Sequence, residues 1–475
     1  MIRYIYKGLE DNDFVPRFFR LLQMSTMLVV FLIFNGCDHF VDVELPPTKL
    51  TSTAVFNDKQ TATAAMSEIY YQLRSTGILT GRSSGISLKL GLYADELDYY
   101  EAEGTGSADF YNNSVLPTAS DVSTFWKTAY TQIYACNAVI EGVDGTTAIL
   151  EADKNQLKGE ALFVRSLLHF YLENMYGTVP YIATTDYRAN SVVGKMGRVE
   201  FYNHLIVDLE LSAALLAPEY ITEDRVRANS YCAKTLLARV FLYNGNWAEA
   251  SNMASAVLNE TQLYSLGALE DTFDKNSTST ILQLMSPSDG INTDEAATFT
   301  FVEAPPYFVA LTSGLMTAFE VGDLRKSNWT QAVTDGSNIF YHAFKYKKNQ
   351  NTGSSVEYPI IFRLADLYLI RSEARAQQGE LTGAKDDLNI IRNHAGLGNT
   401  TAMTQSDLLF ALLKERRVEF FTEYGARFFD LKRTGKLDEA LLGVKLGWNN
   451  SDKLLPLPES ELLLNPKLLP QNDGY

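Results

Sequence analysis

The chain has 475 residues, of which 46% are hydrophobic and 21% are charged, a composition typical of a folded globular protein. Its formal net charge at pH 7 is −16. Nucleic acids and anionic lipid surfaces are bound through basic patches, so an acidic chain of this kind is not expected to bind either. The length allows a large core in one or two domains.

An apolar run near the N-terminus, MLVVFLIF (27–34), leads into Asn35, Gly36 and Cys37. A transmembrane helix needs about 20 apolar residues, and this run is shorter and follows several basic residues, as in a secretory signal. A small residue before a cysteine is typical of bacterial lipoproteins, in which the signal is removed and the cysteine is acylated. We therefore predict a signal peptide over 1–36, lipidation of Cys37 and a tether over 37–57. An ordinary signal peptide or a buried N-terminal strand is the alternative.

Removal of residues 1–36 takes away four basic and three acidic residues, so the remaining chain has a net charge of −17. Electrostatic adhesion to a membrane is then unfavourable, and Cys37 is the expected anchor. Cys136 and Cys232 lie in apolar, helix-like contexts and are expected to be small buried side chains rather than a disulfide framework. The five histidines are not spaced as metal ligands, so no metal or cofactor is expected.

The pattern of apolar residues predicts a mainly helical chain. A helix capped by Asn57 or Asp58 should run to about Leu73, and the glycine-rich stretch 77–121 should be mostly loop. Apolar residues at spacings of three and four predict further helices. In chain order these cover 122–143, 155–176 (with Gly177 as the C-cap), 199–217 and 406–425. The polar stretch 262–358 and the tail 426–475 are predicted to be mostly irregular, with some short strands in the first.

An internal repeat relates residues 236–258 to residues 370–392 at a constant offset of 134. Each copy reads as helix, glycine turn, bulky apolar residue, small residue, helix; for example, Gly245 aligns with Gly379. This pattern is typical of a tetratricopeptide-like helical hairpin. Such hairpins bury their faces by stacking on neighbouring hairpins. We therefore predict a helical scaffold whose functional residues lie in long loops.

Aromatic residues in two of these loops suggest a binding surface. Tyr99 and Tyr100 lie in GLYADELDYYEAEGTGS (91–107), and Tyr307 and Phe308 follow a rigid Pro-Pro pair. Trp329 lies beside a short turn and could complete the surface. Flat aromatic rings and carboxylates suit sugar rings; packing of these rings on the scaffold is the alternative. The acids of 91–107 could also form a glycosidase pair, which requires a separation that the sequence does not give.

The charged stretch ERRVEFFTEYGARFFDLKR (415–433) places Glu415, Glu419 and Glu423 at i, i+4 spacing with arginines nearby. An active-site cluster is one interpretation. A structural network of ion pairs that joins helix to loop is the interpretation we favour. Asp323 and Arg325 are likewise expected to fix a turn. No catalytic residue is assigned.

Seven segments, in order, resemble the SusD/RagB family of outer-membrane lipoproteins of Bacteroidetes. They are CDHFVDVELPPTKLTS from Cys37, WKTAYTQIYACNAVIEGV (126–143), GEALFVRSLLHFYLENMYGTVPYI (159–182), VGDLRKSNW (321–329), the hairpin from FRLADLYLIRSEARAQQG to AKDDLNIIRNHAGL (362–397), ERRVEFFTEYGARFFDLKRTG (415–435) and LLPLPESELLLNPKLLPQNDGY (454–475). The resemblance covers nearly the whole chain after the signal.

The resemblance implies a tetratricopeptide-like α–α superhelix over 58–475, made of an N-terminal helical part (58–260), a loop-rich ligand-binding insertion (261–358) and a C-terminal hairpin and tail (359–475). It also implies a lipid-anchored protein at the cell surface. Such a protein is not an enzyme: it binds oligosaccharides and delivers them to a SusC-like TonB-dependent transporter. Peptide binding of the RagB type is the alternative, and a secreted helical glycoside hydrolase is less favoured.

Overall fold

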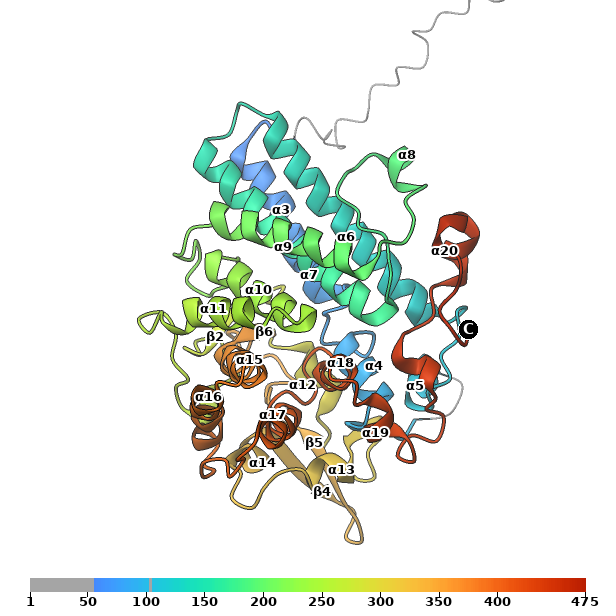
Figure 1. Ribbon diagram of the computed structural model, residues 1–475, viewed down its shortest axis with the longest axis vertical. Helices are drawn as coiled ribbons and strands as arrows, with labels where there is room; N and C mark the ends of the chain where they lie inside the picture. The colour runs from blue at the N-terminus through green and yellow to red at the C-terminus, as the bar shows by residue number, and fades with distance from the viewer. Residues whose placement is uncertain (1–54, 102–104) are drawn as a thin grey trace, which may run out of the picture. The chain divides into compact units, whose positions relative to one another are not determined.

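Helices that are adjacent along the chain pack against one another and build most of the fold. The structure, a computed structural model, describes residues 55–101 and 105–475, which belong to one compact unit. The helices are α3 (Lys59–Ser75), α4 (Ile86–Tyr93), α5 (Gly106–Tyr111), α6 (Ser120–Gly145), α7 (Glu151–Tyr176), α8 (Tyr187–Asn190), α9 (Arg198–Leu215), α10 (Ser230–Asn244), α11 (Trp247–Leu258), α12 (Asp294–Phe299), α13 (Ser313–Met316), α14 (Leu324–Trp329), α15 (Leu364–Gln377), α16 (Leu381–His394), α17 (Gln405–Glu419), α18 (Ala426–Arg433), α19 (Leu437–Leu441) and α20 (Glu459–Leu464). The predicted mainly helical fold is therefore confirmed (Figure 1).

The helical stack continues across the long insertion. Helix α6 packs on α7, α7 on α9, α9 on α10 and α10 on α11; α11 then packs on α15, which packs on α16. The predicted hairpins are therefore α10–α11 and α15–α16, and they stack on each other although residues 259–363 separate them in the chain. Gly245 and Gly379 end the first helix of each hairpin at φ +77° and φ +82°, a conformation that glycine adopts without a steric penalty.

Most of the other predicted helices are confirmed within a few residues. The side chain of Asp58 caps α3 by accepting a hydrogen bond from the backbone N–H of Thr61 at 3.1 Å. Gly177 is the C-cap of α7. Helices α6, α7 and α9 match the predicted ranges 122–143, 155–176 and 199–217.

Three sequence predictions need correction. Residues 77–121 contain α4, a helix buried on all sides; its sequence ISLKLGLY lacks the polar face that periodicity detects. Helix α17 ends at Glu419 rather than near 425, since Thr422 and Tyr424 adopt positive φ values in the turn that follows. The tail after 425 is less irregular than predicted, because it contains α18, α19 and α20.

The insertion contributes most of the strands. They are β1 (Leu97–Tyr99), β2 (Thr280–Gln283), β3 (Val309–Leu311), β4 (Thr330–Thr334), β5 (Ile339–Ala343) and β6 (Ile360–Arg363). One antiparallel sheet has the order β1-β3-β5-β4, with Tyr99 opposite Val309 and Leu311 opposite Tyr341. Strands β2 and β6 form a second, two-stranded sheet. Strand β1 precedes the insertion, so the first sheet joins the insertion to the N-terminal part.

Three tryptophans and two cysteines contribute to the packing of the core. Trp126 and Trp448 are buried, and the indole N–H of Trp448 donates to Asp438 at 3.0 Å. Trp247 is partly buried against the core. Cys136 and Cys232 are free thiols and buried, as predicted.

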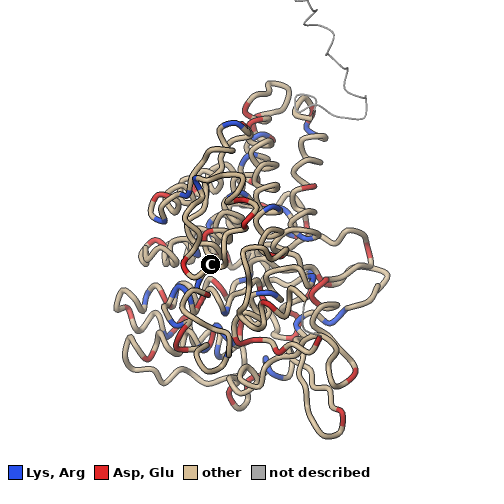
Figure 2. The backbone as a smooth tube through the Cα atoms, turned by 90° about the vertical axis from the view of Figure 1, so that its right-hand side faces the viewer, with Lys and Arg blue, Asp and Glu red and all other residues tan. Residues whose placement is uncertain are grey.

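Among the residues that the structure describes, no helix is long and apolar enough to cross a bilayer, and no cluster of three or more potential metal-ligating side chains is found. Basic residues lie scattered among acidic ones along this part of the chain (Figure 2). The predicted signal peptide, Cys37 and most of the tether lie outside the described residues.

A buried network of ion pairs joins the insertion to α17. Arg325 is fully buried and contacts Glu415 at 2.6 Å, Glu419 at 2.8 Å and Asp323 at 2.8 Å. Arg363 also pairs with Glu419. The structural interpretation of this charged stretch is therefore confirmed, because its acids and bases are buried and paired.

We predict that Glu419→Gln strongly destabilises the fold. Two arginines would then be left buried with one fewer counter-charge, which should lower the free energy of unfolding by about 3–5 kcal/mol. Denaturation in guanidinium chloride measures the change. The matched control is Glu439→Gln, which breaks an exposed pair with Lys436 and should cost less than about 1 kcal/mol. Equal effects of the two variants would contradict the role of the network.

Two buried carboxyl groups predict the pH dependence of stability. Burial raises the pKa of Glu96 to about 8 and that of Glu295 to about 7, from 4.5 for a free glutamate. Above pH 4.5 and below these raised pKa values, the two carboxyl groups are protonated in the native state and ionised in the unfolded state. Stability therefore falls as the pH rises from about 4.5 to 8.

We therefore predict that Glu96→Gln reduces this dependence. The variant should become more stable relative to the natural protein as the pH rises from 5 to 8, measured by denaturation at several pH values. Glu439→Gln, at an exposed site, should leave the dependence unchanged. Parallel curves for Glu96→Gln and the natural protein would show that Glu96 is not protonated in the fold.

Candidate functional site

The structure brings four of the five predicted aromatic residues together. Strand β1 carries Tyr99, and the next residue, Tyr100, continues the pairing: its backbone N–H donates to the carbonyl oxygen of Phe308 at 2.9 Å. Tyr307 and Phe308 immediately precede β3, the partner of β1. We call these four residues, with Tyr111 and Phe340, the aromatic surface.

Tyr99 supports this surface from below. Its ring lies between Tyr111, with ring centroids 6.2 Å apart, and Phe308, at 5.9 Å. Its hydroxyl donates to Glu101 at 2.9 Å and also lies in hydrogen-bond contact with Thr105. Burial raises the pKa of this hydroxyl. The side chain of Tyr99 is thus held by two neighbouring rings and by the hydrogen bonds of its hydroxyl group.

Tyr100 and Tyr307 offer the open ring faces. Tyr100 is 41% exposed and meets the ring of Phe340 edge to face at 5.8 Å. Tyr307 is 79% exposed, and its hydroxyl donates to Glu101 at 3.4 Å. The carboxylate of Glu101 therefore contacts both Tyr99 and Tyr307 and ties the end of β1 to the insertion.

Two charged groups, those of Asp98 and Lys445, contact Tyr111. The hydroxyl of Tyr111 donates to Asp98 at 3.5 Å, and the ammonium group of Lys445 lies 4.0 Å from the centroid of the Tyr111 ring. Burial raises the pKa of Asp98 and lowers that of Lys445 to about 8. The ammonium group also donates to the carbonyl oxygen of Leu92 at 2.7 Å, which fixes it in place.

The prediction that Trp329 completes the surface is wrong. Its side chain is only 1% exposed, since it packs edge to face on Phe273 at 5.3 Å. The indole N–H donates to the carbonyl oxygen of Leu269 at 3.3 Å. Its position at the end of α14 turns the ring into the core, so Trp329 cannot stack on a ligand from solvent.

Asp95 and Glu96, directly before β1, serve a structural role. Asp95 accepts hydrogen bonds from Arg417 at 2.6 Å and from Arg427 at 2.7 Å, and the guanidinium of Arg427 helps to lower its pKa against the opposing effect of burial. Glu96 is buried beside it. These two acids therefore do not form a solvent-accessible pair. Asp95 joins the segment before β1 to α17 and α18, and Glu96 accepts a hydrogen bond from the backbone N–H of Thr422, in the turn between these helices.

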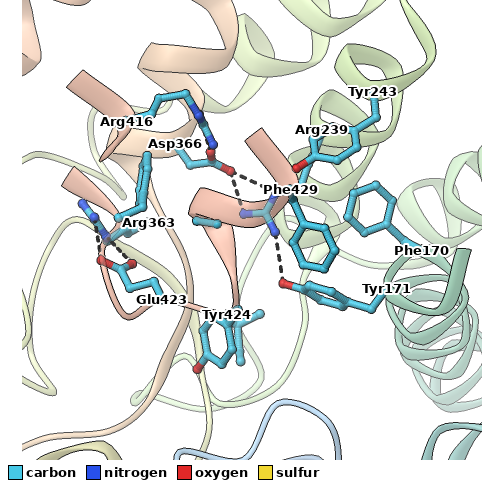
Figure 3. A pocket seen from close by; sticks show the side chains of 13 residues that line it. Phe170, Tyr171, Arg239, Tyr243, Arg363, Asp366, Arg416, Glu423, Tyr424 and Phe429 are labelled. Atoms are coloured by element: carbon cyan, nitrogen blue, oxygen red, sulfur yellow. Dashed lines mark hydrogen bonds and ion pairs between the residues drawn. The ribbon is translucent and has the colours of Figure 1, made fainter. Parts of the chain in front are cut away.

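A second cluster of charged side chains surrounds a cavity that is too small for a sugar ring. Figure 3 shows Arg363 facing Glu423, and Arg239 between Asp366 and Tyr171. The cavity among these side chains has a volume of about 40 Å³. A sugar ring does not fit in this space, so the charged groups here hold helices together.

Sequence reasoning missed three residues of the site. Phe340 lies in IFYHA, a short aromatic-rich run typical of a strand, so its signal was present. Tyr111 and Lys445 gave no such signal, because α5 is one short helix and Lys445 comes from the tail. Long-range packing alone brings them to β1.

Comparison with known protein families and structures yields consistent matches. Residues 313–475 match the family described as "SusD family", and residues 94–242 match the family described as "Starch-binding associating with outer membrane". SusD-like protein P2 of Formosa agariphila is 24% identical, over 95% of this chain and 99% of that protein.

Solved structures share the fold. A SusD superfamily protein of Bacteroides vulgatus aligns with a TM-score of 0.76 at 22% identity, over 88% of this chain and all of that one. A laminarin-binding SusD-like protein aligns with a TM-score of 0.74 at 22% identity, over 88% and 99%. The two family matches cover both the N-terminal helices and the C-terminal part, and the fold agrees: the chain belongs to the SusD/RagB family.

Proposed function

We propose that this protein binds neutral oligosaccharides at the aromatic surface without acting on them chemically. The observation that carries the proposal is the pair of open ring faces, Tyr100 and Tyr307, beside the carboxylate of Glu101. The C–H faces of sugar rings stack on aromatic rings, and a carboxylate accepts hydrogen bonds from sugar hydroxyls. The acids at this surface disfavour sulfated or uronic acid glycans through charge repulsion.

The relatives support this proposal by their described ligands. One structural neighbour binds laminarin, and another is described as a surface glycan-binding protein, from Bacteroides fluxus. Tyr99, Tyr100 and Phe308 suit such a role, because rings that already pack on their neighbours lose little freedom when a ligand binds. We further propose that Cys37 anchors the protein to the outer membrane, and that the bound glycan passes to a SusC-like TonB-dependent transporter.

We predict that Tyr307→Ala and Tyr100→Ala each weaken glycan binding about tenfold or more, equivalent to about 1.4 kcal/mol. Both residues are partly or largely exposed, so the fold should survive. Titration calorimetry of residues 38–475 against laminarin and other neutral glycans measures the affinity, and the same samples are checked for cleavage products.

The matched control is Tyr71→Ala, an exposed tyrosine of α3 outside the surface. It should bind as the natural protein does. Unchanged affinity in both site variants would remove the aromatic surface from the proposal. Release of product would replace binding with glycoside hydrolysis, and tighter binding of sulfated glycans would contradict the preference for neutral ones.

We predict that Cys37→Ser moves the full-length protein from the membrane fraction to the soluble fraction. The acyl chains that would hold it each contribute about 0.8 kcal/mol per buried CH₂ group, and the acidic chain offers no electrostatic substitute. Fractionation of cells that process lipoproteins, followed by immunoblotting, measures the distribution. A variant that stays in the membrane fraction would contradict lipid anchoring through Cys37.

A further inference from the structure

A large cavity borders α17 on the side of α13, α14 and α16. Its volume is about 880 Å³, within the range of pockets that bind small molecules. These helices are labelled in the lower part of Figure 1, and the segment 398–402 after α16 adds to the lining. The cavity shares no lining residue with the aromatic surface. We call it the α17 pocket.

Three side chains from one face of α17 line this pocket. Phe410, Lys414 and Arg417 follow each other at intervals of four and three residues, so they lie along one face of the helix. Phe410 is 57% exposed, a large fraction for an apolar ring. The ammonium group of Lys414 lies 4.5 Å from the centroid of that ring. This face of α17 therefore presents an open ring with a cation beside it.

The acids that line the pocket already have partners within the fold. They are Glu320, Asp323, Asp407 and Glu415. Arg392 donates a hydrogen bond to Glu320 at 2.7 Å. Arg325 donates to Asp323 at 2.8 Å and lies 2.6 Å from Glu415. Asp407 accepts a hydrogen bond from the backbone N–H of Thr404 at 3.1 Å, in the capping box of α17. These four acids are therefore already engaged.

Lys414, in contrast, has no carboxylate of its own. Within residues 55–101 and 105–475 it forms no ion pair and no side-chain hydrogen bond, and its ammonium group contacts the Phe410 ring. The hydrogen bond from Arg392 lowers the pKa of Glu320, and the charge of Lys414 contributes to this effect. Lys414 thus lies near Glu320 without pairing with it. Its ammonium group is free to bind an anion in the pocket.

Arg417 shares its carboxylate with a second arginine. Its Nη2 donates to Asp95 at 2.6 Å, and Arg427 donates to the same carboxylate at 2.7 Å. Burial raises the pKa of the neighbouring Glu96 to about 8, so this acid is mostly neutral at pH 7. The Nε atom of Arg417 is buried and has no hydrogen-bond partner among the described residues. Two guanidinium groups thus meet one ionised carboxylate, which leaves positive charge in excess beside the pocket.

We propose that the α17 pocket binds a small aromatic carboxylate that is not a sugar. The carboxylate of the ligand accepts hydrogen bonds from Lys414 and Arg417, and its flat ring packs on Phe410. The three groups lie on one helix face, so a single rigid ligand can contact all of them. Such a ligand supplies the negative charge that this face lacks and covers the exposed ring.

Other small ligands match the pocket less well. A neutral sugar would leave both cations without a counter-charge, and its hydroxyls would compete for acids that are already paired. A sugar acid carries the charge but has several hydroxyls to place as well. Inorganic phosphate carries the charge but leaves the ring of Phe410 exposed to water. A ring joined to a carboxylate uses the ring and both cations.

The test is calorimetric titration of residues 38–475 with benzoate, the smallest member of the proposed class. Phe410→Ala and Lys414→Gln change exposed side chains, so the fold should survive, and each should weaken binding about tenfold or more. The matched controls are Tyr71→Ala and Lys127→Gln, an exposed ring and an exposed lysine outside the pocket, which should bind benzoate as the natural protein does. No glycan is present, so the result does not depend on the proposed function.

Comparison of ligands completes the test. Benzyl alcohol, which has the ring without the charge, and acetate, which has the charge without the ring, should each bind about tenfold more weakly than benzoate or worse. Equal binding of benzyl alcohol would overturn the role of the carboxylate. Glucuronate that binds more tightly than benzoate would overturn the assignment of a ligand that is not a sugar. Absence of binding at millimolar benzoate, or unchanged affinity in both pocket variants, would overturn the proposal itself.

Discussion

The pairing of Glu419 with Arg325 and Arg363 is the interaction on which the architecture depends. Buried charges are tolerated only when their partners are held in place. Arg325 lies in the first turn of the short helix α14 and Arg363 ends β6, so the two arginines bracket much of the second half of the insertion. Glu423 extends the pairing, because it accepts hydrogen bonds from Lys345 at 2.5 Å and from Arg363 at 2.9 Å. The end of α17 and the turn after it are thus joined both to α14 within the insertion and to β6, where the chain returns to the helices.

Helix α17 also links the scaffold to the aromatic surface. Arg416 pairs with Asp366 of α15 at 3.1 Å and thereby holds the helix to the hairpin stack. The next residue, Arg417, reaches Asp95, directly before β1. Adjacent side chains on one helix therefore connect the repeat to the strand that carries Tyr99. The base of the surface is therefore tied to the scaffold by buried charges as well as by packing.

The sequence predicted the parts of this fold that depend on local pattern. Helical periodicity and the glycine turn at Gly245 are local, so the repeat was evident. Helix α4 was missed because burial on all sides removes the amphipathic signal. For the site, the sequence identified Tyr99, Tyr100, Tyr307 and Phe308 because they lie in segments predicted to be loops. The pairing of β1 with β3 brings these residues together. The orientation of Trp329 could not be inferred, since a ring beside a turn can point either way and only the position of Phe273 decides it.

The same separation between local and long-range information explains how the aromatic surface forms. The long helices form from local periodicity, as in α6, where Trp126, Tyr130 and Tyr134 lie four residues apart on one face. The insertion supplies strands, whose pairing brings single rings from distant segments to one edge. The tail contributes a charged group to this surface, because the ammonium group of Lys445 lies 4.0 Å from the centroid of the Tyr111 ring. The local pattern of the sequence therefore predicts the rings of the aromatic surface one by one, whereas their arrangement depends on strand pairing and on a charged group from the tail.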